Sequence, residues 1–336
     1  MKEEILKVNN LKSYFHLSTG IAKAVDGVSF SLKKGEILGI VGESGSGKSV
    51  TVSSIMGLLP KPIGRIEEGE ILFEGKDLTK LSKKELLKII GKDITMVFQD
   101  PMTSLDPVFT IGNQIIEVLR THNKISKAEA RKRAIEALKL VGIPEPEKRM
   151  NSYPHEFSGG MRQRVIIAMA IISNPQIIIA DEPTTALDVT VQAQILNLLK
   201  DLKEKIDTSI ILITHNLGVV WDTCETVMVM YAGKTVEYTT TEQLYKNPCH
   251  PYTLGLLKSI PKLSDSGNEP LKSIPGSPMD LRLTGTGCNF YNRCKYAEEV
   301  CRIKNPDLIE IEEGHFVACH FQTKGKNIFL EMEGNR

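Results

Sequence analysis

Residues 36–49 read EILGIVGESGSGKS, an apolar run that leads directly into a glycine-rich loop. The run at 37–41 is almost continuously apolar, which is typical of a strand buried on both faces of a parallel sheet. The stretch VTVSSIMGLL at 50–59 then favours a helix that ends before Pro60. A strand, a glycine loop and a helix in this order predict an α/β fold with a phosphate-binding turn at the end of the strand.

The loop matches the pattern G-x-x-x-x-G-K-S through Gly42, Gly47, Lys48 and Ser49. Glycines let the backbone approach an anion closely, so that amide N–H groups and the helix N-terminus point at the phosphates. We expect Lys48 to reach the β and γ phosphates of a nucleoside triphosphate and the Ser49 hydroxyl to bind Mg²⁺. Val50 stands where many such loops have Thr, so a hydroxyl near the α phosphate is expected to be missing. The expected nucleotide-binding residues of this loop are Gly42, Glu43, Ser44, Gly45, Ser46, Gly47, Lys48, Ser49 and Val50.

A second apolar run, QIIIADEP, ends in two adjacent carboxylates at Asp181 and Glu182. Asp181 is expected to hold the magnesium shell, and Glu182 to orient or activate a water for in-line attack on the γ phosphate. His215 ends the next predicted strand, in LITHN. A lone histidine is more often structural than catalytic, but a place beside the Glu182 strand favours a sensor of the γ phosphate.

The rest of the chain predicts a mixed α/β architecture. Ser126, with Glu129 three residues later, forms a capping box that opens a helix. The stretch 189–205 carries an apolar stripe typical of a packed helix, and 224–238 favours a hairpin that turns at Ala232 and Gly233. Beyond Pro248 the composition shifts toward Pro, Gly, Ser and Cys. We therefore expect two domains, at residues 1–245 and 246–336.

Bulk properties exclude several classes of protein. The 336 residues, 41% of them hydrophobic, can bury a substantial core, and a formal net charge of +1 gives no general reason to expect nucleic acid. No stretch approaches the roughly 20 apolar residues of a membrane span, and the N-terminus lacks a basic segment followed by an apolar run. The chain is expected to stay in the cytosol.

Three more motifs complete a family pattern: FSGGMRQR at 157–164, VFQDP with Gln99, and TALD ending at Asp188. With the glycine loop, the two carboxylates and His215, their order and spacing resemble the ATPase subunits of ABC transporters over roughly residues 5–238. This resemblance implies a P-loop ATPase core with a parallel sheet and helices, an antiparallel β subdomain and a helical subdomain at about 100–172. A small loop-rich C-terminal domain would follow.

The resemblance also implies a head-to-tail dimer in which each ATP lies between one subunit's glycine loop and the other subunit's SGG motif. Gln99 would bind magnesium or its water, and Phe15 would stack on adenine, with Tyr14 as the alternative. Met161 departs from the common Gln, which removes a polar side chain near the ribose. The implied roles are catalytic for Glu182, His215 and Gln99, magnesium-binding for Ser49, Gln99 and Asp181, partner-nucleotide-binding for Ser158, Gly159, Gly160 and Met161, and D-loop for Asp188.

Several stretches resemble one branch of this family, the dipeptide and oligopeptide importers: GIVGESGSGKS, MVFQDPMTSLDPVFTIG, EFSGGMRQR, DEPTTALDVTVQAQIL and HPYTLGLLKSIP. This resemblance implies an ATPase that powers peptide import at the cytoplasmic face of the membrane. Its partners would be a second ATPase, two permease subunits and a peptide-binding protein. Nickel or another small cargo is an alternative. A soluble ABC ATPase acting on DNA or ribosomes is another, but it would usually bring two cassettes, a coiled-coil insertion or a basic patch, and none is visible.

Four of the six cysteines lie near the C-terminus, at Cys288, Cys294, Cys301 and Cys319. In a reducing compartment clustered cysteines are more plausibly metal ligands than disulfides. Their gaps are wider than the pairs typical of zinc, although His315 and His320 could complete a zinc site. Four thiolates with wide gaps suit an iron-sulfur cluster.

Importer tails with a similar cysteine pattern are associated with a 4Fe-4S cluster. We therefore favour such a cluster over zinc, and zinc over four reduced, partly buried thiols. The cluster could staple the tail or act as a redox sensor that gates the ATPase. Cys224 and Cys249 are expected to be ordinary packed residues.

Overall fold

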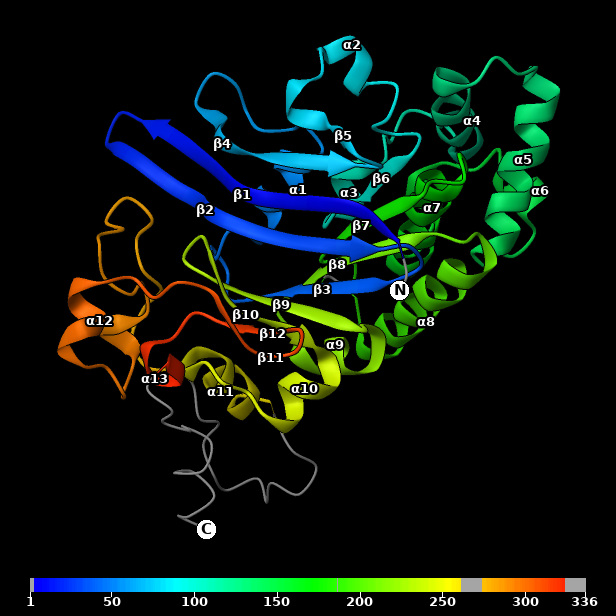
Figure 1. Ribbon diagram of the computed structural model, residues 1–336. Helices are drawn as coiled ribbons and strands as arrows, with labels where there is room; N and C mark the ends of the chain where they lie inside the picture. The colour runs from blue at the N-terminus through cyan, green and yellow to red at the C-terminus, as the bar shows by residue number, and fades with distance from the viewer. Residues whose placement is uncertain (1–2, 186, 261–273, 324–336) are drawn as a thin grey trace. The chain divides into compact units, whose positions relative to one another are not determined.

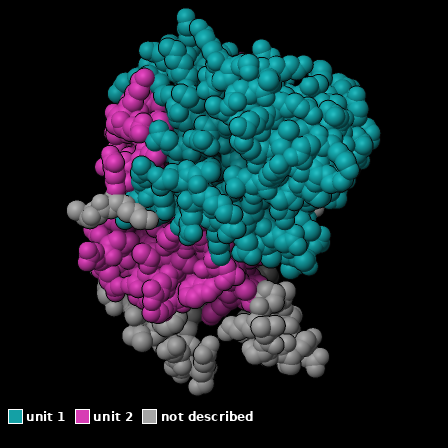
Figure 2. Space-filling view, turned by 90° about the vertical axis from the view of Figure 1, so that its right-hand side faces the viewer, with its two compact units in different colours: residues 1–2, 33–36, 80–213 teal, residues 3–32, 37–79, 214–336 magenta. Residues whose placement is uncertain are grey.

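The computed structural model describes residues 3–185, 187–260 and 274–323 (Figure 1). Contacts divide the chain into two compact units, which Figure 2 shows in two colours. Unit 1 comprises residues 1–2, 33–36 and 80–213, and unit 2 comprises residues 3–32, 37–79 and 214–336. Some residues of the predicted domains and motifs lie outside the described residues. They are residues 1–2 and 324–336, Ala186 of the TALD motif and Pro261 of the HPYT stretch.

Unit 1 is built on three parallel strands. β6 (Ile94–Val97) pairs with β7 (Ile177–Asp181), and β7 pairs with β8 (Ser209–Thr214). All residues of β7 and β8 are buried, as the continuous apolar runs of their sequences require. The helices and turns around these strands are η1 (Leu78–Lys80), α2 (Lys83–Leu86), α3 (Pro101–Ser104), α4 (Ile111–His122), α5 (Lys127–Leu140), α6 (Pro146–Arg149), η2 (Pro154–Glu156), α7 (Gly159–Ile171) and α8 (Val189–Lys205).

Two of the longer helices of unit 1, α5 and α8, begin where the sequence predicts. α5 starts after Ser126, whose hydroxyl accepts a hydrogen bond from the backbone N–H of Glu129 at 3.1 Å. α8 spans the predicted stretch. Of its predicted stripe, Val191 is half-buried, and the buried residues are Ile195, Leu198, Leu199 and Leu202. These helices are therefore held mainly by packing of their apolar faces.

Unit 2 contains a four-stranded sheet in the order β2-β1-β4-β5. Its strands are β1 (Glu4–Leu17), β2 (Gly20–Lys33), β4 (Gly64–Phe73) and β5 (Lys76–Asp77). β1 and β4 run antiparallel, from the pair Leu6–Phe73 to the pair Phe15–Gly64. This sheet matches the antiparallel subdomain that the family resemblance implies.

A second group of strands in unit 2 joins the core to the tail. β3 (Ile37–Val41) runs parallel to β9 (Thr226–Tyr231), β9 turns at Ala232 and Gly233 into antiparallel β10 (Lys234–Thr240), and the tail strands continue the sheet. β12 (His315–Val317) pairs with β10, and β11 (Ile309–Glu312) pairs with β12. β11 and β12 are not predicted from the sequence, because runs of four and three residues are too short to show a period of two.

The remaining elements of unit 2 are α1 (Lys48–Ile55), α9 (Leu217–Thr223), α10 (Thr241–Lys246), α11 (Pro251–Lys258), η3 (Tyr291–Arg293), α12 (Glu299–Ile303) and α13 (His320–Thr323). No helix in the part of the chain that the structure describes is long and apolar enough to cross a membrane.

Candidate functional site

Glu182 follows β7 in a conformation that ordinary side chains avoid. Its φ is 45°, in the left-handed region, which costs a non-glycine residue on the order of 1–3 kcal/mol. Its carboxylate oxygen Oε2 accepts hydrogen bonds from the Gln99 amide Nε2 at 3.1 Å and from the Thr185 hydroxyl at 2.9 Å. The structure thus brings together two predicted catalytic residues, while predicted magnesium ligand Asp181 lies buried at the end of β7.

The SGG motif forms the start of α7, a helix of 13 residues. Ser158 caps it, and its hydroxyl accepts a hydrogen bond from the backbone N–H of Met161 at 3.3 Å. Ser158 and Gly159 are exposed. A Cβ on Gly160 would lie 2.6 Å from a methyl carbon of Val191, so glycine is needed where α7 packs on α8. An exposed helix start that carries Ser and Gly suits a phosphate group.

Asp188 and His215 lie at element boundaries. Asp188 is exposed and caps α8, where its carboxylate accepts a hydrogen bond from Val191 N–H at 3.0 Å. His215 is exposed and directly follows β8, the strand that pairs with β7. Its role as a γ-phosphate sensor stays a prediction.

The two aromatic candidates for adenine differ in their surroundings. Phe15 is half-buried on β1, opposite Gly64 of β4, where an added Cβ would lie 3.0 Å from its ring. The Tyr14 hydroxyl donates to an Asp26 carboxylate oxygen at 2.6 Å. Burial and this hydrogen bond raise the pKa of Tyr14 far above its ordinary value. Tyr14 is therefore already engaged in the fold, and Phe15 remains the better candidate.

All four tail cysteines line one small cavity. Cys288, Cys294, Cys301 and Cys319 lie around it with Phe290, Tyr291, Phe321, His250, Pro306, Pro251 and His320. Cys288 N–H donates to the carbonyl oxygen of Cys301 at 2.7 Å, which joins two of the cysteine-bearing segments. Burial, with neighbouring thiols, raises the pKa of Cys288 to about 11. Segments spread over 32 residues of sequence are thus brought to one point.

The histidines that could complete a zinc site separate in the structure. His320 lines the cysteine cavity. His315 is fully buried, and its Nε2 lies 2.9 Å from a Glu237 carboxylate oxygen. Glu237 also accepts hydrogen bonds from the backbone N–H groups of Cys249 and His250, at 2.8 and 2.9 Å. Glu237 and His315 therefore join β10, β12 and the start of α11, and His315 is not among the residues that line the cysteine cavity.

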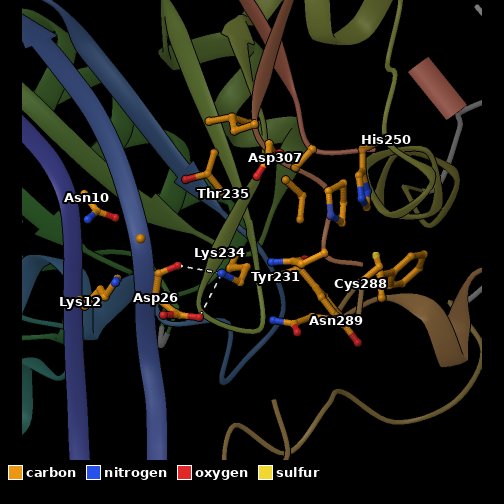
Figure 3. A pocket seen from close by; sticks show the side chains of 17 residues that line it. Asn10, Lys12, Asp26, Tyr231, Lys234, Thr235, His250, Cys288, Asn289 and Asp307 are labelled. Carbon is orange, nitrogen blue, oxygen red and sulfur yellow. Dashed lines mark hydrogen bonds and ion pairs between the residues drawn. The ribbon is translucent and has the colours of Figure 1, made fainter. Parts of the chain in front are cut away.

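A larger polar cavity of about 330 Å³ lies in unit 2 (Figure 3). Its lining comes from β1, β2, the β9–β10 hairpin and the tail, and it includes the ion pair between Lys234 and Asp26 at 3.0 Å. His250, Cys288, Phe290 and Pro306 line both cavities, so the cysteine cavity shares a wall with this polar one. None of the predicted nucleotide-binding residues lines the polar cavity.

The glycine loop connects β3 to α1 in unit 2. Gly42 has φ 154°, and a Cβ there would lie 2.2 Å from the carbonyl oxygen of Met230. Gly47 has φ 104°, and a Cβ there would lie 2.2 Å from the carbonyl oxygen of Ala24. No side chain fits at either position, so backbone packing as well as phosphate chemistry requires glycine at these two places of the pattern.

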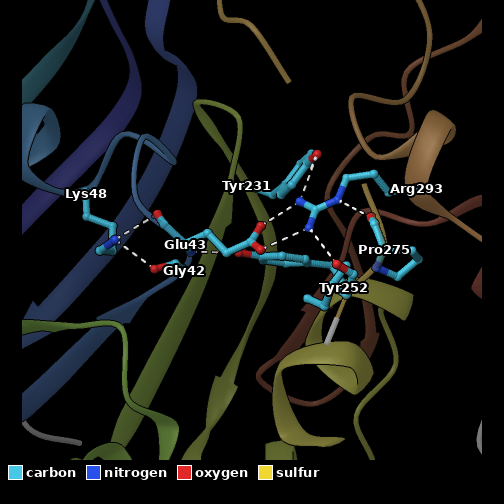
Figure 4. Close-up of polar contacts among 8 residues, drawn as sticks. Gly42, Glu43, Lys48, Tyr231, Tyr252, Pro275 and Arg293 are labelled. Atoms are coloured by element: carbon cyan, nitrogen blue, oxygen red, sulfur yellow. Dashed lines mark hydrogen bonds and ion pairs between the residues drawn. The ribbon is translucent and has the colours of Figure 1, made fainter. Parts of the chain in front are cut away.

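Lys48 curls back along its own loop (Figure 4). Its ammonium nitrogen donates to the carbonyl oxygens of Gly42 at 2.8 Å and Glu43 at 3.0 Å. Ser49 is exposed at the first turn of α1, and Ser46 has a buried hydroxyl oxygen for which the described residues provide no hydrogen-bond partner. A cation, an exposed hydroxyl and a helix N-terminus thus meet at one loop, as triphosphate and magnesium binding require.

Two residues that the sequence motifs do not predict contact this loop. The Arg293 guanidinium binds both carboxylate oxygens of Glu43, at 2.6 and 3.0 Å, and the Tyr252 hydroxyl accepts a hydrogen bond from Glu43 N–H at 2.8 Å (Figure 4). Tyr252 lies in the HPYT stretch, and Arg293 directly precedes Cys294, so both residues lie in segments that carry a sequence motif. No local pattern, however, links either residue to a loop more than 200 positions away.

Two family models match the chain. One, described as ABC transporter, matches residues 25–185, and the other, described as oligopeptide/dipeptide transporter, C-terminal region, matches residues 236–301. The first contains the glycine loop, Gln99, the SGG motif and Glu182. The second contains Tyr252, Arg293 and three of the four tail cysteines.

Curated relatives match almost the whole chain. The oligopeptide transport ATP-binding protein OppD of Bacillus subtilis is 56% identical over 93% of this chain and 87% of the relative. The dipeptide transport ATP-binding protein DppD of the same organism is 52% identical over 96% of each chain.

Solved structures share the fold. A dimeric structure of the ATP-binding cassette MJ0796 bound to ADP and Pi is 32% identical, with a TM-score of 0.63 over 70% of this chain and 98% of that one. CbiO1 of Clostridium perfringens, part of an ABC transporter complex, is 30% identical, with a TM-score of 0.62 over 73% of this chain and 91% of that one. The predicted ABC ATPase fold is thereby confirmed. The chain belongs to the family of ATP-binding subunits of oligopeptide and dipeptide ABC transporters, and its activity is ATP hydrolysis.

Proposed function

We propose that this chain hydrolyses ATP to power the import of dipeptides or oligopeptides across the cytoplasmic membrane. The observation that carries the proposal is the match, over more than nine-tenths of the chain, to ATP-binding subunits named for oligopeptide and dipeptide transport. The matching C-terminal model has the same name. Nickel and other small cargos have no comparable support.

The proposed chemistry gives each predicted site residue one role. Lys48 and the loop amides bind the β and γ phosphates, and Ser49, Gln99 and Asp181 hold Mg²⁺ or its water. Glu182 orients the attacking water, and its hydrogen bonds to Gln99 and Thr185 support this role because they hold the carboxylate in one orientation. His215 senses the γ phosphate and Phe15 stacks on adenine. In this scheme all residues needed for hydrolysis are present in the chain.

The proposed assembly pairs this chain with a second ATPase subunit beneath two permease subunits, at the cytoplasmic face of the membrane. A peptide-binding protein would deliver the cargo. Ser158, Gly159, Gly160 and Met161 would bind the partner's ATP, with Asp188 beside them. The exposed start of α7 supports this arrangement, as does the dimeric state of the related cassette that holds ADP and Pi.

We also propose that residues 1–245 form the ATPase domain and that residues 246–336 form an importer-type extension. The extension would hold a 4Fe-4S cluster on Cys288, Cys294, Cys301 and Cys319. The donor set supports a cluster, because the four thiols line one cavity in the described structure. Zinc is the alternative occupant: His320 lines the cavity and could join the cysteines in such a site, whereas His315 lies away from it.

Glu182→Gln tests the proposed function. In the complete transporter, reconstituted in vesicles, this variant should bind ATP normally but lose at least about 100-fold in ATP turnover, because the carboxylate is the proposed base. Uptake of a labelled tripeptide should fall in parallel, and nickel uptake should be absent in both proteins.

Glu204→Gln is the matched control, since Glu204 is an exposed carboxylate on α8. It should leave both rates unchanged. Full turnover in Glu182→Gln would refute the role of Glu182. ATP-dependent transport of nickel instead of the tripeptide would refute the cargo.

A further inference from the structure

We propose that Arg293 and Tyr252, both in the C-terminal segment, are positioning residues for the phosphate-binding loop and set its affinity for ATP. They touch neither phosphate nor magnesium. They act on Glu43, the second residue of the loop, by fixing its side chain and its backbone N–H. In this view the tail is a part of the nucleotide site.

The Arg293–Glu43 pair has the geometry of a strong ionic contact. Two guanidinium nitrogens reach the two carboxylate oxygens, and only 4% of the Arg293 side chain is exposed. A third contact, from the guanidinium Nε to the carbonyl oxygen of Pro275 at 2.8 Å, fixes the plane of the group. The Tyr231 and Phe290 rings lie 5.7 and 5.9 Å from its central carbon. The orientation of the Arg293 side chain is therefore fixed by contacts other than the one with the loop.

Tyr252 adds a contact to the loop backbone. Its ring is fully buried and lies 4.7 Å from the Tyr231 ring and 5.4 Å from the Phe290 ring, measured between centroids. The hydroxyl is thus carried by a rigid aromatic cluster to the Glu43 N–H, at 2.8 Å. Lys48 binds the carbonyl oxygen of Glu43 from the other side, at 3.0 Å. The N–H, the carbonyl and the carboxylate of Glu43 all have partners, so the peptide planes at the start of the loop are fixed (Figure 4).

This arrangement bears on affinity because a phosphate loop binds through a row of backbone N–H groups that must point in one direction. A loop that is already ordered loses less conformational entropy when the nucleotide arrives. Glu43 lies outside the reacting atoms, so its partners influence binding of substrate and transition state alike. Removing them should raise KM and leave kcat unchanged.

The test compares Tyr252→Phe and Arg293→Met with the wild type, using the full-length chain for nucleotide binding and the complete transporter for ATP turnover. Dissociation constants for a fluorescent ATP analogue, together with KM and kcat for ATP, are the measured quantities. Each variant should weaken nucleotide binding and raise KM by about three- to tenfold, the effect of one lost hydrogen bond or ionic contact, with kcat unchanged. Tyr252→Phe keeps the ring and its packing, so it remains informative if Arg293→Met does not fold.

Arg302→Met is the matched control, because Arg302 is an exposed arginine of the same segment. It should behave as wild type. The single variant Glu43→Gln and the double variant Glu43→Gln with Arg293→Met complete the comparison. If the pair acts as a unit, the double variant should bind ATP no more weakly than whichever single variant binds it less tightly. An unchanged KM in folded Tyr252→Phe and Arg293→Met, or losses that add fully in the double variant, would overturn the proposal.

Discussion

Glu182 shows how a strained residue can mark a reactive position. Its backbone lies in the left-handed region, yet it is a glutamate and not a glycine, and its carboxylate is held by Gln99 and Thr185. Its backbone N–H donates to the carbonyl oxygen of Ile213 on the neighbouring strand at 3.1 Å. The neighbouring strand therefore helps to hold the strained residue in place.

Gly47 allows a sharp test of the loop geometry. Gly47→Ala should destabilise the fold by about 1–3 kcal/mol and weaken ATP binding, because the new Cβ would meet Ala24 O and the backbone would be strained. Urea unfolding and binding of a fluorescent ATP analogue measure the two effects.

The control is Gly45→Ala in the same loop. Gly45 has φ 78°, but a Cβ there would have no heavy atom within 4 Å. Its cost should be that of the backbone alone, about 1 kcal/mol. Equal losses of unfolding free energy and of ATP affinity in the two variants would show that the contact with Ala24 contributes to neither.

At the residue level, a local pattern is enough to propose a role for some residues but not for the residues that support them. The glycine loop and Glu182 carry local patterns that follow from phosphate and metal chemistry, and the role of Gln99 is implied by the family resemblance. Tyr252 and Arg293 act through a glutamate in a variable position of the loop, and their contacts depend on how the tail folds. A single sequence contains no signal for such a long-range pair.

Among the elements, length decided what could be predicted. The 17-residue helix α8 and the buried strands β7 and β8 appear where the sequence predicts, because each shows a clear period or a long apolar run. The tail strands β11 and β12 do not. Their pairing depends on β10, and Glu237 on β10 accepts hydrogen bonds from the start of α11.

The buried histidine at the start of α11 should make the stability of the fold depend on pH. His250 caps this helix, and its Nδ1 accepts a hydrogen bond from Tyr252 N–H at 3.0 Å. Burial lowers the pKa of His250 to about 3. The folded state thus resists protonation, whereas the unfolded chain takes up a proton below about pH 6.5.

Stability should therefore fall as the pH drops from 6.5 toward 3, by about 1.4 kcal/mol per pH unit from this group. Urea unfolding between pH 7.5 and 5 measures the slope. His250→Asn should flatten it, and His155→Asn, at an exposed histidine, should not. The same slope in wild type and His250→Asn would contradict this assignment.

For the molecule as a whole, the division by contacts differs from the division expected from composition. Residues 214–323 belong to the same unit as residues 3–32 and 37–79, which include the glycine loop. Composition changes near residue 246 because the tail is rich in turns, but strand pairing between β10 and β12 continues across that point. The boundary between 245 and 246 stays a prediction that composition alone supports.

The metal content of the whole chain tests whether the tail cysteines bind an iron-sulfur cluster. Chain purified without oxygen should be brown, absorb broadly in the visible range and contain iron. Cys319→Ser should lose all three, and its melting temperature should fall, because a cluster cross-links separate segments.

Cys224→Ser is the control, since Cys224 is buried in the described structure but does not line the cysteine cavity. It should keep iron and colour. A colourless protein that contains zinc and no iron would refute the cluster and favour zinc as the bound metal. Absence of both metals would leave four packed thiols and refute the proposal of a metal site.

The contact between Glu43 and Arg293 joins residues 250 positions apart. The ribosome makes the glycine loop early and its buried partner only after most of the chain has been synthesised. A nascent or prematurely ended chain that stops before residue 293 therefore has the whole G-x-x-x-x-G-K-S pattern but lacks the arginine that holds it. In our interpretation, full ATP affinity therefore arises only after residue 293 has been synthesised and has reached the loop.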